Sequence, residues 1–126
     1  MRKVTFLSVL CAALLELSLQ AAAASDSVAR QIVELSGVDG GIIAHLGCGD
    51  GDLTAALRVN KRFTVQGLER DRALVMKARQ EITDRGLYGP VSVDHLSGPG
   101  LPYADNLVSL LVAEQPEGVS RKEMMR

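Results

Sequence analysis

The sequence predicts an α/β fold built on a doubly wound parallel sheet. Four short apolar runs, at residues 42–46, 63–69, 91–96 and 107–113, have the length and composition of buried strands. The segments between the first three runs carry apolar residues at helical spacing, and glycine or proline marks the turns. Strands that alternate with helices in this way are typical of parallel βα units, so we expect one α/β domain.

A helix is expected ahead of the first strand. The residues at 25–27, Ser-Asp-Ser, are of the kind that cap helix N-termini. Val28, Ile32 and Leu35 then recur at helical spacing, and Gly37 ends the pattern. This predicts a helix that begins near residue 25 and ends just before Gly37.

The later elements have equally local signals. Asp52 begins a short helix, Asp71 caps a longer one that Gly86 closes, and residues 118–126 have the pattern of the first turns of another helix. The continuous apolar run at 107–113 predicts a strand buried on both faces. Open sheets of this type have about six strands. We therefore expect a domain truncated after about four strands, in which residues 25–126 alone are poorly stable.

The first 24 residues differ from the rest. Arg2 and Lys3 precede an apolar run at 4–19, which only Glu16 interrupts, and four alanines follow at 21–24. This order predicts a signal peptide, residues 1–24, cleaved after Ala24, and hence an exported protein, periplasmic or extracellular. An uncleaved membrane anchor and an ordinary folded helix are the alternatives.

Composition limits the functional classes. A chain of 126 residues with a net charge of -1 and 47% hydrophobic residues suits one small domain. The near-neutral net charge gives no sign of a nucleic-acid surface or of a basic patch for a membrane. The export signal is the one feature of the sequence that suggests contact with a membrane. After signal cleavage Cys48 is the one remaining thiol, so no internal disulfide is possible. We predict no metal site.

A glycine loop follows the strand at 42–46. Gly47, Gly49 and Gly51 stand at alternate positions directly before a helix. Glycine lets the backbone approach a ligand closely, and a helix N-terminus offers free N–H groups, so the loop predicts a Rossmann-like nucleotide site. Dinucleotide sites read G-x-G-x-x-G, whereas Asp52 occupies the third glycine position here. Asp52 and Asp50 would repel a pyrophosphate, which favours S-adenosylmethionine over NAD. The alternative is a turn with no ligand.

Glu69 is the second candidate binding residue. It ends the strand at 63–69, about twenty residues beyond the glycine loop. At this place α/β nucleotide sites have the carboxylate that accepts hydrogen bonds from the ribose. The alternative role is to cap the following helix, for which Asp71 is better placed.

Together these segments resemble class I S-adenosylmethionine-dependent methyltransferases. Residues 45–51 are similar to their first motif, 67–69 to their second, acidic motif, and 101–106 to the Leu-Pro-Phe-x-Asp stretch before their fourth strand. The resemblance extends over about residues 28–126. It implies an S-adenosylmethionine cofactor whose methionine portion lies on the glycines, whose ribose is bound by Glu69, and whose adenine lies near the end of the third strand. The candidate cofactor-binding residues are His45, Gly47, Cys48, Gly49, Gly51, Glu69, Arg70, Asp94 and His95.

The sequence departs from the family in two places. His45 stands where the family usually has Asp or Glu, and a neutral imidazole supplies no negative charge for the ligand's ammonium group. His45 could equally be a packed residue at a strand end. Val108-Ser109 replaces a Phe-Asp pair. No side chain can be assigned to catalysis.

Two functions remain open at this point. The first is an S-adenosylmethionine-dependent methyltransferase domain with an unknown methyl acceptor. The second is a non-catalytic Rossmann-like module at the front of a larger exported protein, because the chain is similar to exported bacterial proteins in which a methyltransferase-like front end precedes a β-propeller of quinoprotein-type repeats. An NAD-dependent oxidoreductase is a weaker third possibility.

Overall fold

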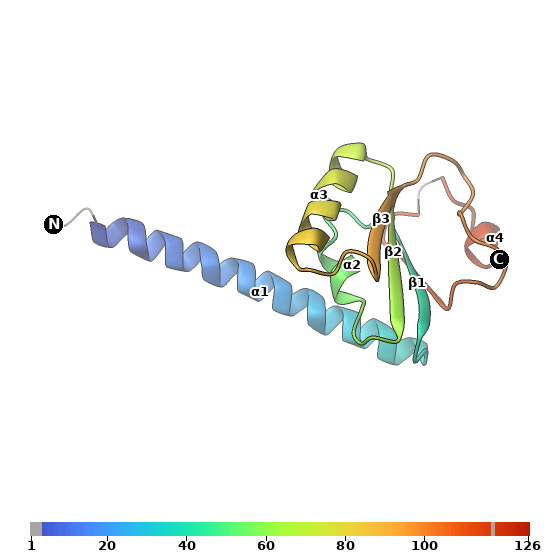
Figure 1. Cartoon of the computed structure of the whole chain (residues 1–126), viewed down its shortest axis with the longest axis horizontal. Helices are drawn as coiled ribbons and strands as arrows, with labels where there is room; N and C mark the ends of the chain where they lie inside the picture. The colour runs from blue at the N-terminus through green and yellow to red at the C-terminus, as the bar shows by residue number, and fades with distance from the viewer. Residues whose placement is uncertain (1–3, 117) are drawn as a thin grey trace.

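The computed structural model describes residues 4–116 and 118–126, with side chains described from residue 20 onward. The elements follow the order that the sequence predicts, a helix and then three strands with helices between them, before a last strand and helix (Figure 1). Their bounds are α1 Val4–Ser36, β1 Gly41–Leu46, α2 Asp52–Ala56, β2 Phe63–Glu69, α3 Arg72–Asp84, β3 Val91–His95, β4 Leu110–Ala113 and α4 Arg121–Met124.

The four strands form one sheet in the order β3-β2-β1-β4, and every neighbouring pair is parallel. The predicted α/β fold with a Rossmann-like parallel sheet is therefore confirmed. After β1 the chain runs outward through β2 and β3, and it then returns to place β4 on the other side of β1. Ligands of open α/β sheets bind at such a reversal, outside the carboxyl ends of the strands.

The first face of the sheet packs against α1, α2 and α3 (Figure 1). Residues two apart along a strand point to the same face, so alternate apolar residues of the strands meet the apolar sides of these helices. The buried members of this core are Ala29, Val33, Ile43, Cys48, Ala55, Leu57, Phe63, Val65, Val75, Ala78, Ile82, Val91 and Val93.

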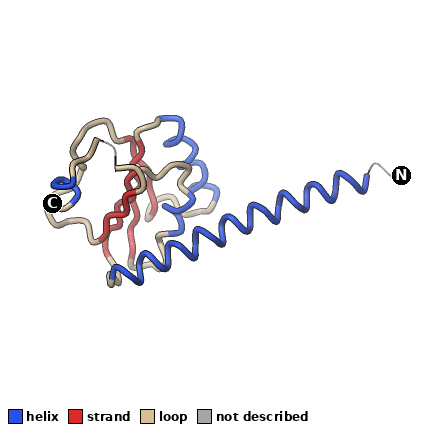
Figure 2. Tube along the Cα trace, turned by 180° about the vertical axis from the view of Figure 1, so that it is seen from behind, coloured by secondary structure: helices blue, strands red, loops and turns tan. Residues whose placement is uncertain are grey.

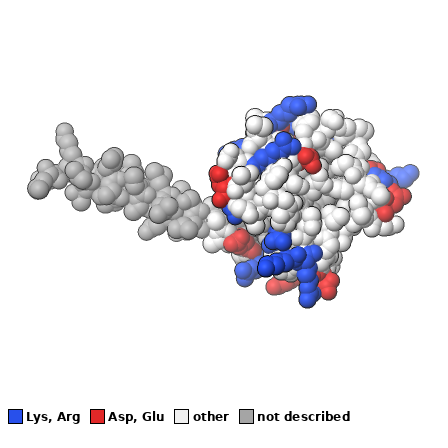
Figure 3. All heavy atoms as spheres, viewed as in Figure 1, with Lys and Arg blue, Asp and Glu red and all other residues white. Residues whose placement is uncertain are grey.

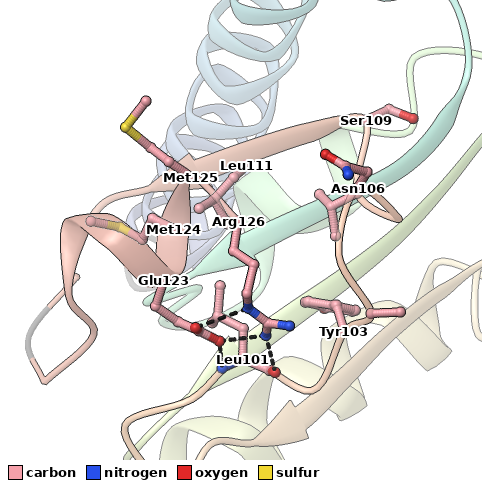
Figure 4. Close-up of a pocket in the computed structure, with 11 residues that line it drawn as sticks. Leu101, Tyr103, Asn106, Ser109, Leu111, Glu123, Met124, Met125 and Arg126 are labelled. Carbon is pink, nitrogen blue, oxygen red and sulfur yellow. Dashed lines mark hydrogen bonds and ion pairs between the residues drawn. The ribbon is translucent and has the colours of Figure 1, made fainter.

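The second face has a smaller core. The buried residues there are Leu46, Leu68, Leu96 and Val119. The loop at 97–109 and α4 cover this face, on the side of the sheet opposite α1–α3 (Figure 2). They leave a cavity of about 260 Å³ between the loop, β4 and α4 (Figure 4). No residue of the candidate cofactor-binding set lines this cavity.

Two sequence expectations on element bounds are wrong. The first helix does not begin at residues 25–27, because α1 runs without interruption from Val4 to Ser36. This span contains no glycine or proline, and alanines at 21–24 favour helix. The apolar run at 107–113 forms only the short strand β4, whose residues are half-buried or exposed because β4 is an edge strand. Leu107 lies before β4 and is 48% exposed.

The N-terminal part of α1 extends away from the sheet (Figure 1). Within the described part of the chain, no helix is both long and apolar enough to cross a membrane. Basic and acidic side chains are interspersed over the face of the domain drawn in Figure 3.

Candidate functional site

The glycine loop has the backbone that its sequence requires. Gly47, Gly49 and Gly51 have φ angles of 75°, 57° and 84°. Residues with a Cβ rarely adopt these values, so each glycine relieves a steric conflict. The loop is joined to β2 by a hydrogen bond in which the Gly47 N–H donates to the Leu68 carbonyl at 2.8 Å.

The three glycines face different surroundings. A Cβ on Gly47 would lie 2.8 Å from both the backbone N and the Cβ of Gln115, in the segment after β4. A Cβ on Gly51 would lie 2.9 Å from the Cβ of Ala78 in α3. A Cβ on Gly49 would meet nothing within 4 Å. Gly51 thus serves the packing of the loop on α3, whereas Gly47 serves its packing on the segment after β4.

Glu69 joins the end of β2 to the glycine loop. It is buried, and its Oε2 accepts a hydrogen bond from the Gly49 N–H at 2.9 Å. Its Oε1 accepts from the N–H groups of Arg70 and Asp71 at 2.8 and 3.2 Å. A carboxylate accepts about four hydrogen bonds. Oε2 therefore retains room for one further donor, such as a ribose hydroxyl.

His45 is fully buried at the carboxyl end of β1. Its Nδ1 lies 2.8 Å from the hydroxyl of Thr54 in α2, and its Nε2 lies 3.3 Å from Oε1 of Glu114. Burial lowers the pKa of His45 more than the Glu114 and Glu69 carboxylates raise it. The imidazole is therefore neutral at pH 7, which is consistent with Thr54 donating to Nδ1 and Nε2–H donating to Glu114.

The pKa of His45 leads to a prediction for stability. Above the ordinary histidine value of 6.5 the imidazole is neutral in both the folded and the unfolded chain. Below it the unfolded chain binds a proton that the folded chain resists, so the free energy of unfolding should fall as the pH drops below 6.5 and through the lowered pKa of the folded state. Denaturant unfolding of wild type and His45→Gln at a series of pH values checks this. An equally steep decline in His45→Gln would assign the effect to other groups.

Glu114 and Gln115 are site residues outside the candidate cofactor-binding set. Glu114 follows β4, and its backbone N–H donates to the Leu46 carbonyl at the end of β1. Gln115 lies against Gly47, as described above. Their position directly after an apolar run was the available sequence signal, but their neighbours are known only once β4 is paired with β1.

Two further candidates have mainly structural contacts. Cys48 is buried against Gly67, and burial, together with the Glu69 carboxylate, raises the pKa of its thiol to about 12. It therefore faces the core of the first face. The Arg70 guanidinium donates to the carbonyls of Leu96 and Gly98 at 3.4 and 3.1 Å, which holds the loop after β3 close to the end of β2.

Asp94 and His95 lie at the end of β3, next to β2. Asp94 accepts hydrogen bonds from Gln66 at 2.5 Å and from Arg79 at 3.3 Å. The Tyr103 hydroxyl donates to the side-chain oxygen of the same Gln66 at 2.7 Å. His95 Nε2 donates to the backbone carbonyl of Arg70 at 2.9 Å. Both residues therefore lie beside the end of β2, where His95 is paired with Glu69.

Asp52 does not have the role that the sequence analysis gave it. Its carboxylate pairs with Arg85 at the end of α3 and accepts a hydrogen bond from the Ser25 hydroxyl of α1. Because Asp52 faces the helices and is neutralised by Arg85, its charge cannot be what excludes a pyrophosphate from the loop. The prediction that the Asp52 carboxylate repels a pyrophosphate is therefore wrong.

A crevice lies where the carboxyl ends of β1, β2 and β4 meet. It encloses about 80 Å³. Its lining is Leu46, Gly47, Leu68, Glu69, Arg70 and Gln115. This is the reversal point of the strand order, so the structure brings Gly47, Glu69 and Arg70 of the candidate set together where open α/β sheets bind ligands.

This sheet order, together with the glycine loop and the acidic residue after β2, defines a class: the chain has the fold of class I S-adenosylmethionine-dependent methyltransferases. It belongs to the family described as methionine biosynthesis protein MetW, whose family model matches residues 27–94.

Individual relatives agree with this class. A ubiquinone/menaquinone biosynthesis C-methyltransferase, UbiE, of Hydrogenovibrio crunogenus is 33% identical over 85 residues, which is 65% of this chain and 34% of the relative. A structure described as a putative S-adenosylmethionine-dependent methyltransferase of Methanococcus maripaludis is 24% identical with a TM-score of 0.64, over 70% of this chain and 40% of that one. An RNA methyltransferase of Salinibacter ruber, solved in complex with S-adenosylhomocysteine, is 26% identical with a TM-score of 0.57. The match covers 69% of this chain and 56% of that one. The chain therefore spans about a third to a half of these relatives.

Proposed function

We propose that this chain is the cofactor-binding part of an S-adenosylmethionine-dependent methyltransferase. The observation that carries the proposal is the crevice at the strand reversal, where the glycine loop after β1 meets Glu69 after β2 and the segment after β4. Two relatives support the proposal: one is described as a C-methyltransferase, and another was solved with S-adenosylhomocysteine.

The chemistry of the residues fits this cofactor. S-adenosylmethionine carries a sulfonium, an ammonium and a carboxylate, so its net charge is positive. The carboxylates of Glu69 and Glu114 both raise the pKa of His45, and Glu69 lines the crevice, so negative charge lies beside it. Gly47 lines the crevice without a side chain, and Oε2 of Glu69 retains room for a ribose hydroxyl.

In this reading the bound cofactor supplies an activated methyl group on its sulfonium. The residues of this chain bind and orient the cofactor: Glu69 holds the ribose and fixes Gly49, and Gly47 lets the segment after β4 lie close to the loop. Methyl transfer is an in-line displacement, so such positioning provides much of the rate enhancement. We assign cofactor binding, and no proton transfer, to the described residues.

The test is calorimetric titration with S-adenosylhomocysteine. Glu69→Ala should weaken binding by about 1–3 kcal/mol, the usual cost of losing a charged hydrogen-bond partner. Glu34→Gln, which changes an exposed carboxylate on α1, should bind as wild type does. Circular dichroism shows whether each variant is folded. Equal affinity of Glu69→Ala and wild type would contradict the role of Glu69.

A second candidate function is a binding module that does not carry out methyl transfer, at the front of a larger exported protein. Two observations favour it. The buried, neutral His45 supplies no charge to a ligand, and three of the lone pairs of Glu69 are already used by backbone N–H groups. For this function we expect no binding of S-adenosylhomocysteine in the same titration, either to the wild-type chain or to a longer version of it that completes the sheet.

Export by a cleaved signal peptide is the remaining part of the proposal. Supporting it, residues 20–28 of α1 contain no buried side chain, and the first buried residue of the described side chains is Ala29. Cleavage after Ala24 would leave the core intact. Mass spectrometry of the protein from a fractionated bacterial host should find an N-terminus at Ser25 outside the cytoplasm. Ala24→Arg should block cleavage, because small residues are needed at that site, and Ala23→Arg should not. An intact N-terminus on the wild-type protein would contradict it.

A further inference from the structure

Glu114 places an accessible carboxylate beside the crevice. Its backbone is fixed, because its N–H donates to the Leu46 carbonyl at 3.0 Å. Its side chain is 51% exposed, and Oε1 lies 3.3 Å from Nε2 of His45. The next residue, Gln115, lies against Gly47 in the lining of the crevice. Glu114 is therefore adjacent to the glycine loop and still open to a ligand.

Glu69, the other carboxylate at the crevice, is differently placed. It is 7% exposed, and three backbone N–H groups already donate to its two oxygens. These hydrogen bonds stabilise much of the negative charge of the Glu69 carboxylate and hold the carboxylate against the glycine loop. Of the two carboxylates, Glu114 is the more exposed and has more free oxygen lone pairs for a cation.

His45 fixes the orientation of Glu114. The imidazole is fully buried, and Thr54 in α2 holds its Nδ1 at 2.8 Å. With Nδ1 accepting from the Thr54 hydroxyl, Nε2–H points at Oε1 of Glu114 as a donor. A rigid neutral donor can orient a carboxylate without cancelling its negative charge.

We propose that Glu114 is the carboxylate that binds the ammonium group of the cofactor's amino-acid portion, and that His45 is a positioning residue that holds Glu114 in place. The inference rests on the proposed function. Glu114, directly after β4, supplies the negative charge that the neutral His45 cannot supply. Glu114 thereby contributes to selectivity for nucleosides that carry an amino-acid group.

Two probes separate this inference from the proposed function. S-adenosylhomocysteine carries the amino-acid group, and 5′-methylthioadenosine lacks it while keeping the adenosine and the sulfur. Both are titrated calorimetrically into the full chain. Glu114→Gln should lower the affinity for S-adenosylhomocysteine about 10- to 100-fold, as expected for a charged hydrogen bond. It should change the affinity for 5′-methylthioadenosine less than about twofold, within the error of distant surface substitutions.

Each outcome decides the matter. An unchanged affinity of Glu114→Gln for S-adenosylhomocysteine would overturn the inference and leave the proposed function standing. An equal loss for both probes would also overturn it, because the effect would then not depend on the ammonium group. Failure of the wild-type chain to bind either probe would overturn the proposed function and the inference together. Glu34→Gln is the matched control, and it should bind both probes as wild type does.

The positioning role of His45 is tested by a double-mutant cycle. His45→Leu removes the donor and should reproduce the loss seen in Glu114→Gln, for S-adenosylhomocysteine alone. His45→Gln keeps a terminal N–H and should retain most of the affinity. The double variant His45→Leu, Glu114→Gln should bind no more weakly than Glu114→Gln. Full additivity of the two changes would show that His45 does not act through Glu114.

Discussion

Gly51→Ala should lower the free energy of unfolding by about 2–4 kcal/mol. Gly51 has a φ of 84°, in the left-handed region that costs a residue with a Cβ about 1–2 kcal/mol. The new Cβ would also lie 2.9 Å from the Cβ and 3.0 Å from the Cα of Ala78. Because α2 begins at this point and Ala78 belongs to α3, the clash would separate the two helices or tilt the loop.

The measurement is urea unfolding of wild type, Gly51→Ala and Gly86→Ala. The free energies of unfolding are compared with the same slope, the m-value, for all three proteins. Gly86 has a similar φ of 68°, but a Cβ there would meet nothing within 4 Å. It therefore reports the backbone cost alone, about 1–2 kcal/mol. If the two variants lose the same stability, the close approach of the loop to α3 contributes nothing.

The comparison of Gly51 with Gly47 also bears on function. The glycine spacing predicted one ligand-binding loop, and the structure divides its glycines between packing on α3 and lining the crevice. A spacing pattern reports where a Cβ is not tolerated, and it does not say whether a ligand or another helix is the obstacle. The identity of the obstacle depends on contacts with Ala78 and Gln115, which are far away in the sequence.

Local signals predicted the parts of the fold that depend on local physics. The strands β1, β2 and β3 have continuous or alternating apolar residues, and their bounds agree with the expected ones to within a residue. The N-cap role of Asp71 is confirmed, since its side chain accepts from the N–H groups of Ala73 and Leu74. These features follow from hydrogen bonds and burial within a few residues.

Features set by long-range pairing could not be predicted in this way. Glu114 contacts His45, 69 residues earlier, only because β4 pairs with β1. Asp52 was taken as a charge facing a ligand, but Arg85, 33 residues later, turns it toward α3. The start of the first helix was misplaced because residues 25–27 are good capping residues that also tolerate the interior of a long helix.

Phe63→Ala should be still more damaging, with a loss of about 3–5 kcal/mol in the free energy of unfolding. Phe63 is 1% exposed and begins β2, where it belongs to the larger core between the sheet and α1–α3. Replacing it with Ala would leave a cavity that the surrounding strands and helices can fill only in part. Small domains have only about 5–15 kcal/mol of stability.

This loss would affect the site as well as the fold, because β2 carries Glu69 to the crevice at its other end. The matched control is Tyr88→Ala, which removes an aromatic ring that is 57% exposed and should change stability by less than about 0.5 kcal/mol. Denaturant unfolding and thermal melting of the three proteins provide the comparison. A loss below about 1 kcal/mol in Phe63→Ala, far under the usual range for a buried aromatic residue, would mean that β2 is not anchored in a packed core. In that case the position of Glu69 beside the glycine loop would lose its structural basis.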